Sequence, residues 1–191
     1  IDTVHWFSGL KHPRSVVANG GIYMWKDGRS NWDTTFAVFD YGPADDSTSG
    51  FQVTFGSRMH NGDENPSEIY YSNGGELNLI TNMVSPKGGL GENHAKAMNM
   101  KPNLLPEMKL VDKSDKVIAS ANTGADVLTS NHMRNFMECM RSRQQTNAPV
   151  EAGYYHSIAT IMTNAAVRTG AKVTFDEKKQ EVMANGKVWH L

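Results

Sequence analysis

Four or five segments with the pattern of β-strands follow one another between residues 15 and 80, and no helical pattern separates them. Parallel neighbours in a sheet need long crossover connections, usually helices, whereas antiparallel neighbours can be joined by short turns. The connections here are of the second kind, among them the polar loop 42–50 and the turn Asn73-Gly74-Gly75. The order of the segments therefore predicts a mainly antiparallel sheet.

The expected strands cover residues 15–25, 34–41, 51–55, 68–71 and 76–80, with a bulge or tight bend at Asn19-Gly20-Gly21 in the first. Alternation along them leaves one face relatively polar, with Thr34, Gln52, Thr54 and Asn78 available for it. Helices should cover only the other face. We expect an α+β fold with an open, mainly antiparallel sheet, helices packed on one face, and the other face free for a ligand or a second subunit.

The last third of the chain carries two helical patterns. The first, which Ser130 can cap, has Met133, Phe136, Met137 and Met140 at the i, i+3, i+4 and i+7 positions of a core-facing stripe. The second starts around Pro149 and ends at Gly170, and its predicted buried stripe is Tyr154, Ile158, Ile161, Met162 and Ala165. Short strands at 172–175 and 181–183 are expected to pair with each other.

Residues 83–110 show little regular period and contain several Pro and Gly residues. An irregular segment of this length inside a compact domain is usually functional, interfacial or mobile. Its four methionines, Met83, Met98, Met100 and Met108, suit an adaptable contact surface. A plain surface excursion is the alternative interpretation.

A length of 191 residues suits one domain, so we expect a single domain over residues 1–191. Lys and Arg number 19 against 20 Asp and Glu, without long runs of one sign, so nucleic acid is not an expected partner. No apolar run approaches the roughly 20 residues that span a bilayer, which argues against a membrane partner.

Histidine spacing predicts no metal site. Gly89-Leu90-Gly91 lacks the third glycine of a dinucleotide-binding loop, so no cofactor-binding residue is predicted in this chain.

The chain opens on Ile1-Asp2-Thr3-Val4-His5-Trp6, a helical pattern with no initiator Met and no capping residue ahead of it. A helix needs partners for its first backbone N–H groups. We therefore expect the 191 residues to be the back part of a larger protein. What Asp2 and His5 do on this helix then depends on the residues that precede them.

A group of polar side chains is expected where the strand that begins at Phe51 leaves the sheet: Arg58, His60, Asn61, Asp63 and Glu64. Such a group can hydrogen-bond a polyol while Arg58 holds a carboxylate or a phosphate. A solvated turn is the alternative interpretation of the same residues.

Several short motifs occur in order along nearly the whole chain. They are Ile1-Asp2-x-x-His5-Trp6-Phe7-x-Gly9, Ser15-Val16 with Ala18-Asn19-Gly20, Asp33-Thr34, Phe39-Asp40-Tyr41, Glu68-Ile69-Tyr70-Tyr71-x-x-Gly74-Gly75, the run from His132 to Arg143, Pro149-Val150-Glu151-x-Gly153 and Phe175-Asp176. Together they resemble the C-terminal domain of the family of glucose-fructose oxidoreductase, inositol dehydrogenase and rhizopine-catabolism proteins, called Gfo/Idh/MocA.

The resemblance implies a C-terminal substrate and oligomerisation domain of an NAD(P)-dependent oxidoreductase that acts on a sugar, a cyclitol or a related polyol. In that family an N-terminal Rossmann domain, absent from this chain, binds NAD or NADP, and the open face of the sheet commonly makes a homodimer or larger homo-oligomer. The catalytic residues are expected just upstream of Ile1, so none lies in this chain and the chain alone is expected to be inactive. Asp2 matches an acidic position near the sugar pocket, whereas Arg58 and His60 correspond only loosely to substrate contacts.

Two alternatives remain open at this stage. Some relatives use tightly held NAD to cleave glycosides through transient oxidation, and the chain can also be read as a non-catalytic binding or dimerisation module. We expect a cytoplasmic protein, with any export signal lying upstream of Ile1.

Overall fold

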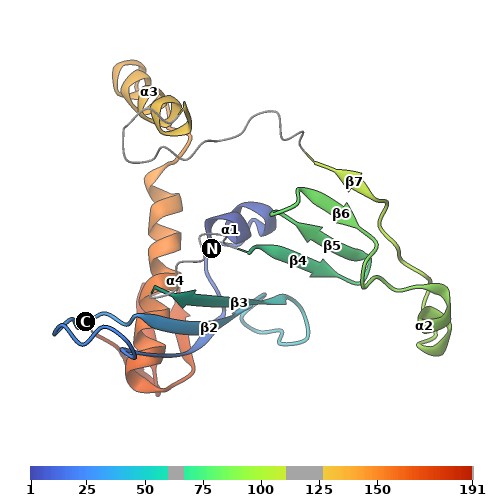
Figure 1. Cartoon of the computed structure of the whole chain (residues 1–191). Helices are drawn as coiled ribbons and strands as arrows, with labels where there is room; N and C mark the ends of the chain where they lie inside the picture. Colours follow the sequence, from blue (N-terminus) through green and yellow to red (C-terminus); the bar gives the residue numbers. More distant parts are fainter. Residues whose placement is uncertain (60–66, 111–126, 191) are drawn as a thin grey trace. The chain divides into compact units, whose positions relative to one another are not determined.

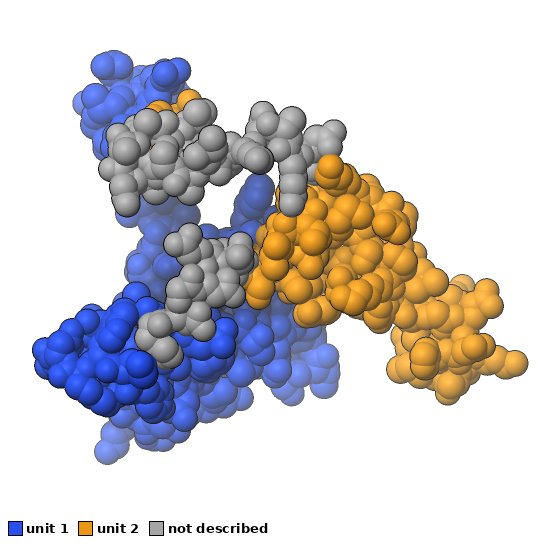
Figure 2. Space-filling model, viewed as in Figure 1, with its two compact units in different colours: residues 1–62, 132–191 blue, residues 63–131 orange. Residues whose placement is uncertain are grey.

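The computed structural model describes residues 1–59, 67–110 and 127–190 of the chain. These residues divide into two compact units (Figure 2). Unit 1 comprises residues 1–62 and 132–191, and unit 2 comprises residues 63–131. Unit 1 is therefore assembled from the two ends of the sequence, with unit 2 inserted between them.

Unit 1 contains a six-stranded sheet in the order β10-β9-β8-β1-β2-β3. Figure 1 labels its strands β2 and β3. Its strands are β1 (Ser15–Gly21), β2 (Thr34–Tyr41), β3 (Phe51–Arg58), β8 (Val173–Asp176), β9 (Glu181–Ala184) and β10 (Lys187–Val188). Every ladder in it is antiparallel, and β1 lies at the centre, paired with β2 and β8. The predicted α+β fold with an open antiparallel sheet is confirmed.

Helix α4 (Val150–Thr169) packs against β1, β8 and β9. Its buried side chains are Ile158, Ala159, Met162, Ala165 and Ala166. On the sheet side, Val16 and Val173 are fully buried. The helix ends at Gly170, whose φ of 65° is left-handed and suits a residue without a Cβ atom. This end and most of the buried stripe agree with the sequence. Tyr154 is an exception, 44% exposed, because its hydroxyl reaches the side chain of Gln180 in the turn before β9.

Helix α3 (Val127–Ser142) departs from its prediction more strongly. Ser130 lies inside the helix and does not cap it. The predicted core-facing residues Met133, Phe136, Met137 and Met140 are between 40% and 57% exposed. The prediction of a core-facing helix is wrong, because an apolar stripe is buried only where another surface covers it, and none of the described residues covers this one.

Strand β1 also differs from the sequence-based expectation. Asn19, Gly20 and Gly21 pair in regular register with Phe36, Thr35 and Thr34, so these positions contain no bulge. The strand ends at Gly21 and does not continue to Trp25. The reason is Asp33, whose carboxylate accepts the backbone N–H groups of residues 23–25 and so withdraws them from the sheet ladder.

Unit 2 contains a separate four-stranded antiparallel sheet in the order β4-β5-β6-β7. Its elements are β4 (Ile69–Ser72), β5 (Gly75–Asn78), β6 (Met83–Ser85), helix α2 (Glu92–Ala97) and β7 (Met108–Lys109). The predicted turn between Ser72 and Gly75 is confirmed. Asn78 lies in this second sheet, so it is not part of the polar face of the first, because β4–β7 pair only with one another.

The segment 83–110 holds β6, α2 and β7 and is otherwise irregular. Met98, Met100 and Met108 are 62%, 49% and 49% exposed. Their role as a contact surface stays a prediction. No helix among the described residues is long and apolar enough to cross a membrane.

Candidate functional site

Helix α1 (Asp2–Ser8) presents the polar residues that the sequence singled out at the start of the chain. Val4 is its one buried residue, and Gly9 ends it in the left-handed conformation. Asp2, His5 and Trp6 are spaced i, i+3 and i+4 and therefore neighbour one another on the helix surface. The contacts of Asp2 and His5 decide what this surface can do.

His5 is attached to the sheet through Tyr41. Its Nε2 atom lies 2.9 Å from the Tyr41 hydroxyl, and the two rings meet edge to face with centroids 5.7 Å apart. Tyr41 is fully buried and stacks on Phe51, with centroids 5.2 Å apart. Burial lowers the pKa of His5 and raises the pKa of Tyr41. A protonated phenol beside a neutral imidazole suits a hydrogen bond in which Tyr41 donates to His5.

Asp2 is attached to helix α4 through His156. Nδ1 of His156 donates to Oδ1 of Asp2 across 2.7 Å, and the side chains are 44% and 77% exposed. We call Asp2, His5, Tyr41 and His156 the α1 cluster. The members of the cluster lie on α1, on β2 and on α4, so the cluster joins three elements of unit 1. Helix α4 is itself packed on β1 of the same sheet.

His156 is not indicated by any sequence pattern. Its pairing joins residues 154 positions apart, so no local spacing signals it. The residue also lies off the apolar stripe that marks α4, where a histidine is an ordinary surface residue. Only the packing of α4 on the sheet places it beside Asp2.

Arg58 lies away from the α1 cluster. It is exposed, ends β3 and pairs with Thr34, whereas Tyr41 pairs with Phe51 at the other end of the same ladder. The ladder runs over eight residue pairs, so its two ends lie about 23 Å apart. The structure therefore does not bring Arg58 together with the α1 cluster, and His60 lies outside the described residues.

The end of the sheet near Arg58 is organised by Asp33. Its carboxylate is 1% exposed and accepts N–H groups from Tyr23, Met24 and Trp25 and the hydroxyl of Thr34, at 2.8–3.1 Å. Burial on its own raises the pKa of Asp33, but these four donors outweigh it and hold the pKa well below its usual range. A carboxylate whose oxygens accept this many hydrogen bonds from its own chain has a structural role, and we do not assign it to ligand binding.

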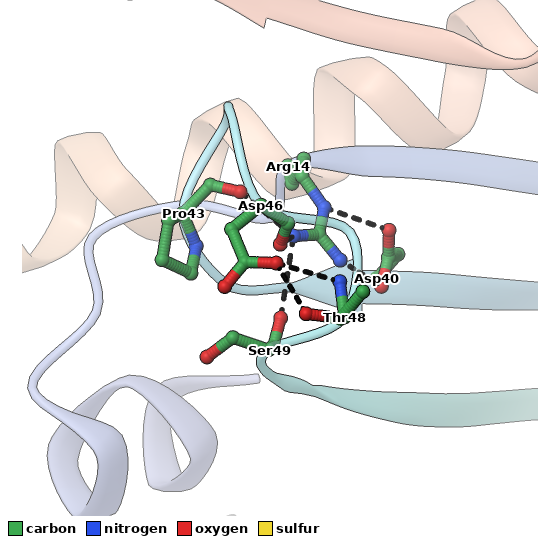
Figure 3. A network of polar contacts seen from close by, with 6 residues as sticks. All are labelled: Arg14, Asp40, Pro43, Asp46, Thr48 and Ser49. Carbon is green, nitrogen blue, oxygen red and sulfur yellow. Dashed lines mark hydrogen bonds and ion pairs between the residues drawn. The ribbon is translucent and has the colours of Figure 1, made fainter.

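The opposite end of the β2–β3 hairpin is organised by Arg14 (Figure 3). Its guanidinium makes two bonds of 2.9 Å to Asp40 and donates to the carbonyl oxygens of Pro43, Asp46 and Ser49 in the connecting loop. Figure 3 shows these acceptors gathered around the one side chain. The hydrogen bonds from Arg14 lower the pKa of Asp40. This network fixes the loop that follows Tyr41, and so supports the strand ends on which His5 rests.

The face of the sheet opposite α4 contains a shallow hollow of about 490 Å³. Strand register places Val17, Val38 and Thr54 side by side there, and likewise Asn19, Phe36 and Gly56. Val17 is 45% exposed and Phe36 is 52% exposed. Thr34, Gln52 and Thr54 do lie on this face, as the alternation predicted, but its centre is apolar.

The loop from Gly89 to Gly91 does not have the form of a dinucleotide-binding loop. Gly89 and Gly91 precede α2, a helix of six residues that has Glu92 in its first turn, where a carboxylate opposes the binding of a pyrophosphate. Among the described residues, no group of three or more His, Cys, Asp or Glu side chains could hold a metal ion.

Comparisons with known proteins give one structural likeness. No family model matches the chain, and no curated protein matches it significantly. A solved structure of a protein named as a putative oxidoreductase, yvaA from Bacillus subtilis, aligns with 92% of this chain and 48% of its own, at 12% sequence identity and a TM-score of 0.48. The chain thus spans about half the length of that protein.

Proposed function

We propose that this chain is the substrate-binding and oligomerisation domain of an oxidoreductase that acts on a sugar, a cyclitol or a related polyol. The observation that carries the proposal is the α1 cluster. Its Asp2 carboxylate is 77% exposed, and a hydrogen bond from His156 holds it in place. Carboxylate and imidazole groups are good partners for hydroxyl groups, which both donate and accept hydrogen bonds. The sequence motifs that resemble the Gfo/Idh/MocA family include Asp2 and support the same assignment.

The role of this chain in such an enzyme is to bind and orient the polyol. On the basis of the family resemblance, we assign the binding of NAD or NADP, and the acid–base residues of the reaction, to residues upstream of Ile1. Asp2 would then form one wall of the substrate pocket. Arg58, at the far end of the sheet, and His60 would belong to that pocket only if the upstream residues or a second subunit extend it to them.

Two titrations and an assay test this proposal. Isothermal titration of the 191-residue chain with NAD(H) and NADP(H) should give no binding. The protein that includes the upstream residues should reduce NAD⁺ or NADP⁺, measured as absorbance at 340 nm, with at least one of myo-inositol, D-glucose and D-sorbitol. Micromolar binding of either cofactor by the isolated chain would contradict the assignment of cofactor binding to the upstream residues.

The same preparation separates the two alternatives. Release of the chromophore from nitrophenyl glycosides without net reduction of added cofactor would identify an NAD-dependent glycosidase. An upstream sequence without a glycine-rich βαβ segment would instead identify a binding module without a catalytic parent.

We further propose that the open face of the sheet in unit 1 forms a homodimer contact. Exposed apolar side chains at the centre of a sheet face, rimmed by polar ones, are typical of a protein interface. Val17 and Phe36 provide the apolar centre, and Asn19 and Gln52 lie at its edge. A two-fold axis through this face would place each apolar centre against its own copy.

A further inference from the structure

We infer that His156 is a positioning residue for the substrate-binding carboxylate of Asp2. The inference rests on the proposed function, because it concerns the same pocket. It assigns a role to a residue at the far end of the sequence that no motif indicates.

Little besides His156 holds the side chain of Asp2. Among the described residues, the bond to Nδ1 of His156 is the one side-chain hydrogen bond found for Asp2. Helix α1 is only seven residues long and has no side-chain cap at its N-terminus. A helix this short is marginal by itself, and its first turn frays most readily. Without His156, the Asp2 carboxylate would sample several rotamers in solvent.

The residue that holds Asp2 lies on a well-packed helix. His156 belongs to α4, a helix of 20 residues, and its near neighbours Ile158 and Ala159 are 3% and 0% exposed. A side chain on a packed helix can orient a carboxylate on a less fixed one. Functional groups held in this way need less ordering when a ligand binds, which raises affinity.

The hydrogen bond joins one defined atom of the imidazole to one oxygen of the carboxylate. The bond to Asp2 occupies Nδ1 of His156, so it fixes the orientation of the ring and of the carboxylate relative to each other. Among the residues that the structure describes, no hydrogen bond is found for the second carboxylate oxygen of Asp2, so this oxygen can accept one from a substrate hydroxyl. The pair therefore presents an oriented carboxylate oxygen to a hydroxyl group of the polyol.

The test uses the protein that includes the upstream residues, with whichever of myo-inositol, D-glucose and D-sorbitol it oxidises fastest. His156→Ala should raise KM for that polyol about tenfold, the effect expected for losing one charge-assisted hydrogen bond, and change kcat much less. His156→Asn should restore most of the affinity, because its amide N–H can stand where Nδ1–H stood. In an Asp2→Asn background, His156→Ala should have little further effect.

Ser157→Ala is the matched control, because the Ser157 hydroxyl bonds the carbonyl of Gly153 on the same helix and does not contact Asp2. Its KM and its urea midpoint should equal those of the wild type. If His156→Ala leaves KM unchanged, or if His156→Asn does not restore it, the inference is overturned while the proposed function stands. If the wild-type protein oxidises none of the three polyols and cleaves no glycoside, the proposed function fails and this inference fails with it.

Discussion

The protonation of His5 links the α1 cluster to the stability of unit 1. Burial lowers the pKa of His5 in the folded chain. The unfolded chain therefore takes up a proton at this residue first, as the pH falls below about 6.5. The contribution of His5 to stability is complete above that pH and is lost as the pH falls through the lower, folded pKa.

We predict that His5→Gln reduces the dependence of unfolding free energy on pH between about 7 and 5. Urea unfolding at a series of pH values measures it, and the difference between wild type and variant isolates this one residue. His190→Gln, at an exposed position, is the control and should keep the wild-type dependence. Identical pH profiles for the wild type and His5→Gln would contradict the burial of this imidazole.

At the other end of the sheet, we predict that removing the carboxylate of Asp33 destabilises the fold. Asp33→Ala removes the carboxylate that accepts three backbone N–H groups. We expect the urea midpoint to fall by about 1 M, since each lost acceptor strands a donor that folding has removed from water. Asp45→Ala, on the exposed loop, should leave the midpoint unchanged. Equal midpoints for both variants would show that the carboxylate is dispensable.

The sequence allowed candidate residues to be identified, but it did not allow their hydrogen-bond partners to be predicted. Asp2 was identified as a candidate from the motif around it, but its bond to His156 depends on tertiary packing. Arg14 carried no signal, although it organises the loop after β2. A hydrogen bond between distant segments leaves no periodicity in the sequence.

Helices α3 and α4 show why periodicity alone does not decide burial. Both were predicted to face a core, yet Met162 of α4 is fully buried while Met137 of α3 is 40% exposed. We predict that Met162→Ala lowers the free energy of unfolding by about 2–4 kcal/mol. Met137→Ala should lower it by less than about 0.5 kcal/mol. Chemical denaturation of the 191-residue chain measures both, and a large loss for Met137→Ala would mean that α3 is covered in solution.

The strands were predicted better than the helix environments. Strand β2 occupies residues 34–41 as expected, because alternating β-branched and aromatic residues bounded by turns are a local signal. The division of the strands between two sheets was not predicted. It depends on which strands pair, and the same local patterns permit several pairings.

The proposed homodimer gives the prediction for the whole molecule. Phe36→Lys places a charge at the centre of the open face, where a partner copy would bury it without a counterion. We expect the wild-type chain to sediment as a dimer and Phe36→Lys as a monomer in analytical ultracentrifugation. Gln144→Lys, at an exposed position outside the sheet, should remain dimeric. A monomeric wild type, or a dimeric Phe36→Lys, would exclude this interface.

The central position of β1 has a consequence for how the protein is made. Strand β1 pairs with β2 early in the sequence and with β8 near its end, where Ser15 meets Thr174. During synthesis, β1, β2 and β3 can pair as soon as they have left the ribosome. The other edge of β1 stays unpaired until β8, at about residue 174, has also left it. Unit 2 is continuous in sequence and can form in the meantime. An unpaired edge is a site for aggregation. The interval of translation between β3 and β8 is therefore when we expect this chain to depend most on chaperones.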